Sequence, residues 1–117
     1  MTTGPYTLTA TEVLHKIKAG ELTVEEYARS LLARIGDRDE AVQAWAYLDP
    51  DYVVKQAKAL DGVPPSERGP LHGVAIAVKD VIYTKGEIPT FKTHLAAAIL
   101  NQSHRHADTV QFAHLCR

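Results

Sequence analysis

Residues 69–80, with the sequence GPLHGVAIAVKD, decide the fold that we expect for this chain. Within this stretch, the consecutive apolar residues Val74 to Val78 follow turn-forming Gly and Pro, and a charged pair comes directly after them. A run this short and this continuously apolar is typical of a strand that is buried on both faces. Lys79 stands at the carboxyl end of the strand, where open α/β sheets carry their chemistry. The alternative is a lysine that merely ends the strand and reaches solvent.

Composition indicates a soluble protein with a modest core. The chain has 117 residues, which falls within the range of one domain. Its formal net charge of -1 provides no basic field for nucleic acid. The single cysteine, Cys116, excludes an intrachain disulfide and fits a reducing compartment. Neither a signal peptide nor an apolar run of membrane-spanning length occurs, so we expect a cytoplasmic protein without nucleic-acid or membrane partners.

Two helices are expected near the start of the chain, over residues 8–20 and 22–36. Each begins with the pattern Thr-x-x-Glu, at Thr9 and at Thr23, which forms a capping box. Each has an apolar stripe at helical spacing and ends near a glycine. Because only a short polar loop separates them, we expect the two helices to be antiparallel neighbours.

The middle of the chain predicts a connector, a strand, a helix and a loop. Residues 37–40 are charged. Residues 41–48 alternate with period two and include aromatic side chains, which favours a strand, although the alanines would tolerate a helix. Asp49 followed by proline is a helix start, and the helix is expected to continue to about Leu60. Residues 63–69 contain two prolines and predict an irregular loop that leads into the buried strand.

Residues 91–117 show weaker patterns, although Asp108 is a possible cap for a final helix. The region also holds four histidines: His94, His104, His106 and His114. A His-x-His pattern can place two imidazoles on one side of a strand and bind a metal ion. No strand is expected there, and no Cys or carboxylate stands at ligand spacing, so a His-rich irregular tail is favoured. The glycine spacing also fits no phosphate-binding loop, and we expect no metal and no cofactor.

Residues 69–80 resemble the start of the core in amidase-signature enzymes. The sequences of those enzymes typically contain the pattern G-x-L-x-G-[IV]-P-x-x-[VI]-K-D. A short segment that begins with Gly and ends with Thr follows it, and residues 86–90 match that segment here. Residues 42–50 and 57–61 resemble the family's first strand and the helix after it. Ala75 departs from the pattern, since the family usually has proline there. The resemblance covers about residues 8–90, so we interpret 1–117 as one incomplete domain with a divergent tail over 91–117.

The resemblance implies an α/β fold and a catalytic mechanism. The expected fold is an N-terminal helical pair followed by the first strands and a helix of a larger mixed sheet. The implied mechanism is that of Ser-Ser-Lys amidases, with Lys79 as the catalytic lysine. An unprotonated lysine accepts a proton, through a bridging serine, from the serine that attacks a small-molecule amide. This requires burial and neighbours that lower the lysine pKa.

The serines that this mechanism needs are not found in a suitable context. The chain has Ser30, Ser66 and Ser103, and none lies in the glycine- and serine-rich segment that the family uses. We therefore expect an N-terminal amidase fragment that is inactive alone. The alternatives are a non-catalytic small partner of a full-length relative and the product of an interrupted gene without its own activity. The pattern specifies neither the amide nor the oligomeric state.

Overall fold

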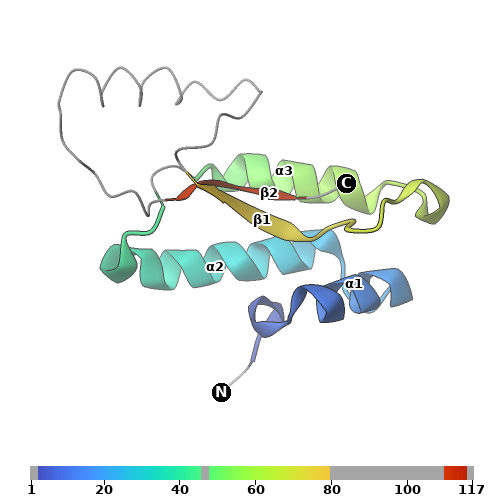
Figure 1. The fold of residues 1–117 in the computed structure, drawn as a ribbon, viewed down its shortest axis with the longest axis horizontal. Helices are drawn as coiled ribbons and strands as arrows, with labels where there is room; N and C mark the ends of the chain where they lie inside the picture. Colours follow the sequence, from blue (N-terminus) through green and yellow to red (C-terminus); the bar gives the residue numbers. More distant parts are fainter. Residues whose placement is uncertain (1–2, 46–47, 80–109, 116–117) are drawn as a thin grey trace.

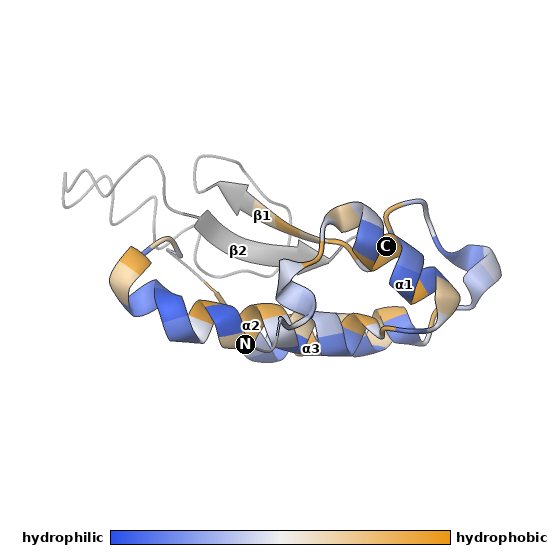
Figure 2. Cartoon of the chain, turned by 90° about the horizontal axis from the view of Figure 1, so that it is seen from below, coloured by the Kyte–Doolittle hydropathy of each residue, from blue (hydrophilic) through white to orange (hydrophobic). Residues whose placement is uncertain are grey.

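The computed structural model describes residues 3–45, 48–79 and 110–115, with the backbone alone described for residues 78, 79 and 110–115 (Figure 1). In chain order the elements are η1 (Pro5–Thr7), α1 (Ala10–Ala19), α2 (Val24–Val42), α3 (Pro50–Asp61), η2 (Pro65–Glu67), β1 (Ala75–Lys79) and β2 (Val110–Leu115). Figures 1 and 2 together show two layers: α2 and α3 lie side by side, and the strand pair β1–β2 lies over them. The described part of the chain is therefore mostly helical with a small sheet, which agrees with α/β only coarsely.

The core lies among the three helices and the loop between α1 and α2. Its buried members are Val13, Ile17, Leu22, Val24, Tyr27, Ala28, Val53, Ala57 and Leu60. Most of them lie on the apolar stripes expected from the sequence, because helical spacing brings these side chains to one face. The principal helix–helix contact, however, is between α2 and α3 and not between the first two helices as expected. None of the described helices combines the length and the apolarity needed to cross a membrane.

Both predicted capping boxes are confirmed. At α1, Glu12 N donates to Thr9 Oγ1 at 3.3 Å, and Thr9 N donates to Glu12 Oε2 at 2.7 Å. At α2, Glu26 N donates to Thr23 Oγ1 at 3.1 Å, and Thr23 N donates to Glu26 Oε2 at 2.9 Å. Each pair satisfies two backbone donors that a helix start leaves without intrahelical partners. These local patterns therefore define where α1 and α2 begin.

The capping boxes predict that the chain loses stability in acid. Hydrogen bonds from the backbone and the hydroxyl of Thr9 hold the pKa of Glu12 below its ordinary value of 4.5, and those from Thr23 do the same for Glu26. A carboxylate with a lowered folded-state pKa stabilises the fold above about pH 4.5, and this contribution is lost as the pH falls through the folded-state pKa. Glutamine keeps the hydrogen bond without the titration. The double variant Glu12→Gln/Glu26→Gln should therefore lose less stability than the wild type in urea unfolding between about pH 4.5 and pH 3. Equal losses would contradict this expectation.

The end of α2 differs from the prediction. The helix continues through Gly36 and residues 37–40 and ends at Val42, and the capping residue Gln43 has a positive φ of 52°. A glycine inside a helix costs only about 1 kcal/mol and does not by itself stop it. Asp39 instead provides the end, because its Oδ1 accepts a 2.7 Å hydrogen bond from Ala44 N.

The predicted strand over residues 41–48 is therefore wrong for the residues that the structure describes. Ala41 and Val42 are helical, and Trp45 makes only a single β-bridge. Trp45 packs against the helical core. Residues 46 and 47 lie outside the described part. The helix predicted from Asp49 to about Leu60 is confirmed as α3, with Asp49 Oδ1 accepting from Tyr52 N at 3.0 Å.

Asp61, the last residue of α3, connects α3 to the start of α2. Its Oδ1 accepts from Val24 N at 2.8 Å, and its Oδ2 accepts from Glu25 N at 3.0 Å. Together with Thr23, it satisfies the first three N–H groups of α2. A carboxylate is also favourable beside the positive end of the helix dipole. The carboxylate of Asp61 thus fixes the relative position of the two packed helices.

Replacing Asp61 by alanine should reduce the free energy of unfolding by about 1–3 kcal/mol, because two partly buried N–H groups lose their acceptor. Urea unfolding followed by circular dichroism measures the loss. Glu40→Ala, which removes an exposed carboxylate from α2, is the matched control and should stay within about 0.5 kcal/mol of wild type. A loss no larger than that of the control would contradict the capping role.

The sheet also differs from the prediction in two respects. β1 and β2 form a two-stranded antiparallel sheet, and residues 110–115, expected within a helix capped by Asp108, form the second strand. The strand predicted over residues 74–78 is present, but Ile76 is 43% exposed and Ala77 is exposed, so it is not buried on both faces. Among the described residues β1 has one neighbouring strand, and so lacks the cover that a strand within a larger sheet has.

Candidate active site

The turn before β1 fixes the position of the strand on the helices. His72 N donates to Gly69 O at 3.3 Å, and Val74 N donates to Leu71 O at 3.0 Å. Gly73, between these bonds, has a φ of 85°, a conformation that glycine adopts without steric cost. His72 and Val74 on either side of it are buried. The turn thus packs into the core at Gly73 and Val74.

Gly73 also approaches the helices so closely that no side chain fits. A Cβ atom built on it would lie 2.8 Å from Ile17 Cδ1 of α1 and 2.8 Å from Val24 Cγ2 of α2. The sequence pattern identified this glycine only as a turn residue. Its close approach depends on contacts with residues more than 40 positions earlier in the chain, which periodicity does not reveal.

Lys79 is the last residue of β1, as the sequence predicted. The pairing of β1 with β2 shifts in register immediately before it: Val78 pairs with Phe112 and Lys79 with Val110, so that Gln111 is an extra residue on β2. Bulges of this kind re-aim the backbone and recur beside active sites. Lys79 thus lies at the end of a short strand, and the turn before that strand packs against the helices at Gly73.

The other residues singled out from the sequence are not assembled with Lys79 by the described residues. Ser30 Oγ accepts from Tyr6 N at 3.0 Å and thereby attaches η1 to α2. Ser66 is exposed within η2, and Ser103 lies outside the described residues. Neither β1 nor β2 contains a serine. The described part of the chain therefore presents the lysine of the implied mechanism without its serines.

The histidines considered as metal ligands are also only partly described. His94, His104 and His106 lie outside the described residues, as do residues 86–90 of the resemblance. His114 lies on β2, where it pairs with Ile76. The described residues contain no group of three or more His, Cys, Asp or Glu that could hold a metal ion.

Comparison with known proteins assigns the chain to a family. Residues 26–117 match the Amidase family, which is most of the sequence and includes the whole of the 69–80 stretch. The chain belongs to the Amidase family. The match begins within α2 and leaves α1 outside it. The resemblance seen in the sequence is therefore confirmed.

Similar family members are components of an amidotransferase. The A subunit of the glutamyl-tRNA(Gln) amidotransferase of Streptomyces coelicolor is 44% identical over 87 residues, which cover 71% of this chain and 17% of that protein. The protein of the same name from Lysinibacillus sphaericus is 40% identical over 77 residues, covering 66% of this chain and 16% of that protein. The chain thus spans only about 17% of the length of such relatives. No solved structure matches it significantly.

Proposed function

We propose that this chain is the lysine-bearing N-terminal segment of an amidase-type catalytic unit, with Lys79 as its proton acceptor. The observation that carries the proposal is the position of Lys79, at the end of the strand formed by the family-matching stretch 69–80. The close packing of Gly73 against α1 and α2 supports the proposal, because a catalytic base acts only when a rigid scaffold positions that base.

The proposed chemistry is cleavage of a carboxylic amide through an acyl-enzyme. Lys79, in its neutral form, accepts the proton of a nucleophilic serine through a bridging serine. The serine oxygen then bonds to the amide carbon, the amine departs with a proton, and water releases the acid. A neutral lysine near pH 7 requires a lowered pKa, which burial beneath the remainder of the catalytic unit would provide. Both serines belong to that remainder.

The partial exposure of β1 supports a larger sheet in the complete unit. Ala75, Ile76 and Ala77 line a largely apolar groove of about 180 Å³ together with side chains of α2 and α3. Apolar strand residues left in contact with solvent are usual where a neighbouring element belongs. We propose that the rest of the amidase domain covers this groove, which makes residues 1–117 one incomplete domain.

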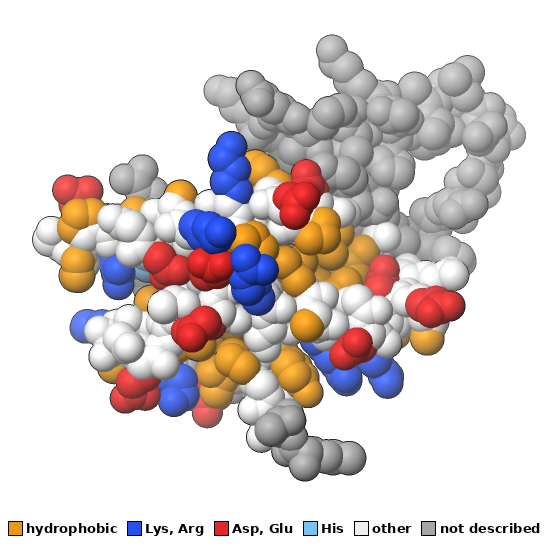
Figure 3. Space-filling model, turned by 180° about the vertical axis from the view of Figure 1, so that it is seen from behind, with side chains coloured by type: hydrophobic (Ala, Val, Ile, Leu, Met, Phe, Trp, Pro, Cys, Tyr) orange, Lys and Arg blue, Asp and Glu red, His pale blue; other side chains and the backbone are white. Residues whose placement is uncertain are grey.

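The relatives' name suggests one substrate for the complete unit. They are glutamyl-tRNA(Gln) amidotransferase subunits, so transfer of amide-derived ammonia is a candidate activity beside simple amide hydrolysis. We place contacts with tRNA outside this chain. Its formal net charge is -1, and acidic and basic side chains alternate on the face seen in Figure 3. The cytoplasmic location expected from the sequence stays a prediction.

The purified 117-residue chain should show no amidase activity, because its described strands carry no serine beside Lys79. The measurement is ammonia release from glutamine, asparagine and simple aliphatic amides. The Lys79→Ala variant serves as the background control, and equal rates for both chains are expected. Saturable hydrolysis that depends on Lys79 would contradict the proposal that the serines lie elsewhere. It would also exclude the non-catalytic alternatives.

A further inference from the structure

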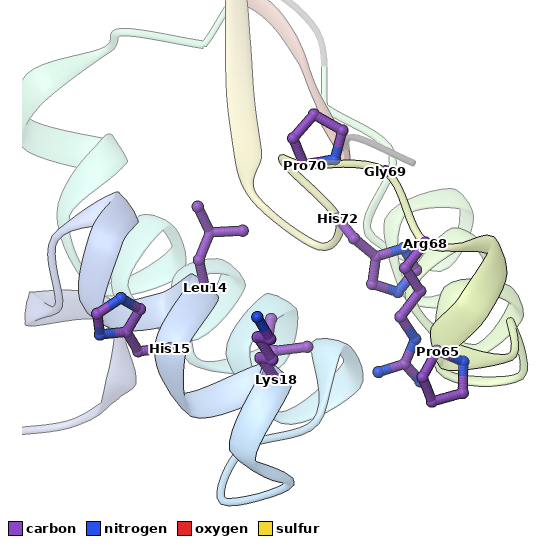
Figure 4. Close-up of a pocket in the computed structure, with 9 residues that line it drawn as sticks. Leu14, His15, Lys18, Pro65, Arg68, Gly69, Pro70 and His72 are labelled. Atoms are coloured by element: carbon purple, nitrogen blue, oxygen red, sulfur yellow. The ribbon is translucent and has the colours of Figure 1, made fainter.

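A pocket lies between α1 and the segment over residues 65–72 (Figure 4). Its volume is about 510 Å³, which is within the range of sites for small organic ligands. Leu14 and Ile17 of α1 form one apolar wall, and Pro65 and Pro70 contribute to the other. The pocket is thus built from an element outside the family match and from the turn that leads into β1.

Two basic side chains line this pocket from opposite walls. Lys18 comes from α1 and Arg68 from the segment after η2, as Figure 4 shows. His15 and His72 complete the polar lining, and none of the described lining residues is acidic. The pocket therefore combines apolar walls with positive charge.

Neither cation is neutralised by another described residue. Arg68 Nε donates to Val63 O at 2.9 Å, which holds the side chain in place and leaves its terminal nitrogens for a ligand. Within the described residues Lys18 forms no ion pair, whereas Lys16 of the same helix pairs with Glu21 at 3.3 Å. A guanidinium held by its Nε still presents a planar set of donors, and such donors suit the two oxygens of a carboxylate.

We propose that this pocket binds a small organic carboxylate with an apolar body. The carboxylate would lie between Lys18 and Arg68, and the apolar body would lie against Leu14 and Pro70. Charge-assisted hydrogen bonds and burial of apolar surface would each contribute to binding. The proposal is independent of the amidase function, because it uses neither Lys79 nor any serine.

The test uses NMR on the full 117-residue chain, isotopically labelled, and follows the chemical shifts of the backbone amides as a ligand is titrated in. Hexanoate should shift the amides of residues near Lys18 and Arg68 in a saturable manner. Hexan-1-ol, which keeps the apolar body but lacks the charge, should bind at least about tenfold more weakly, as expected for loss of a charge-assisted bond. Inorganic phosphate, which lacks the apolar body, should also bind more weakly. Equal binding of either probe and hexanoate would overturn the proposal without the use of any variant.

Variants test the two cations directly. Lys18→Gln/Arg68→Gln should weaken hexanoate binding at least about tenfold, since both charges that face the carboxylate are removed. Lys16→Gln is the matched control from the same helix, and its affinity should equal that of wild type. Circular dichroism establishes that each variant is folded. Undiminished binding by a folded double variant, or an equal loss in Lys16→Gln, would overturn the proposal.

Discussion

Replacing Gly73 by alanine should destabilise the chain by about 2–5 kcal/mol. Two effects add at this position. Alanine at a φ of 85° takes on the cost of a left-handed conformation, about 1–2 kcal/mol. Its Cβ would also lie 2.8 Å from atoms of both Ile17 and Val24, so the turn must move away from the helices. Such overpacking typically costs about 1–3 kcal/mol.

Gly20 provides a matched control for the first of these effects. It also has a positive φ, 75°, but no heavy atom lies within 4 Å of a Cβ built on it. Gly20→Ala should therefore cost about 1–2 kcal/mol, from backbone conformation alone. Urea unfolding of both variants separates the two contributions. Equal losses would mean that the close approach of Gly73 to α1 and α2 does not matter for stability.

Local patterns in the sequence predicted the helix starts correctly. The capping boxes at Thr9 and Thr23 involve residues only three positions apart, and the chemistry of the four residues suffices to recognise them. The start of α3 at Asp49 and Pro50 is equally local. The family resemblance rested on a similar short stretch, and the match over residues 26–117 confirms it.

Features that depend on distant residues were missed or predicted wrongly. The role of Asp61 in joining α3 to α2 was not predicted, because its bonds to Val24 and Glu25 join residues more than 30 positions apart. The end of α2 lies later than predicted, because Asp39 and not Gly36 provides it. Pairing of residues 110–115 with β1 likewise depends on a neighbouring strand and not on local periodicity.

The candidate site was predicted only in part for the same reason. The turn residues and the strand that carries Lys79 form one continuous stretch, so sequence was enough to find them. The pocket between α1 and residues 65–72 joins segments about 50 positions apart, and no sequence motif connects them. In the sequence Lys18 and Arg68 therefore look like ordinary surface charges, and only the fold brings them to one pocket.

Replacing Lys79 by alanine in an active amidase unit should reduce the rate of amide hydrolysis by about 100- to 10,000-fold. The reason is the loss of the proton acceptor, without which the serine is a weak nucleophile. Arginine should not restore the rate, because its guanidinium stays protonated. The fold should persist, since the substitution leaves the backbone of β1 unchanged and the turn at Gly73 holds β1 to the helices. Lys85→Ala, which changes a lysine close by in the sequence without a proposed role, is the control and should retain nearly full activity.

An active unit can be made by joining residues 1–90 of this chain to the part of the Streptomyces coelicolor amidotransferase protein that follows the shared segment. The decisive measurement is ammonia release by this chimera, assembled with the other subunits of that enzyme, before and after Lys79→Ala. We predict an active chimera whose activity falls at least about 100-fold in a variant with an unchanged circular dichroism spectrum. A folded but inactive chimera, or a folded Lys79→Ala chimera with nearly unchanged activity, would contradict the assignment of Lys79 as the catalytic base.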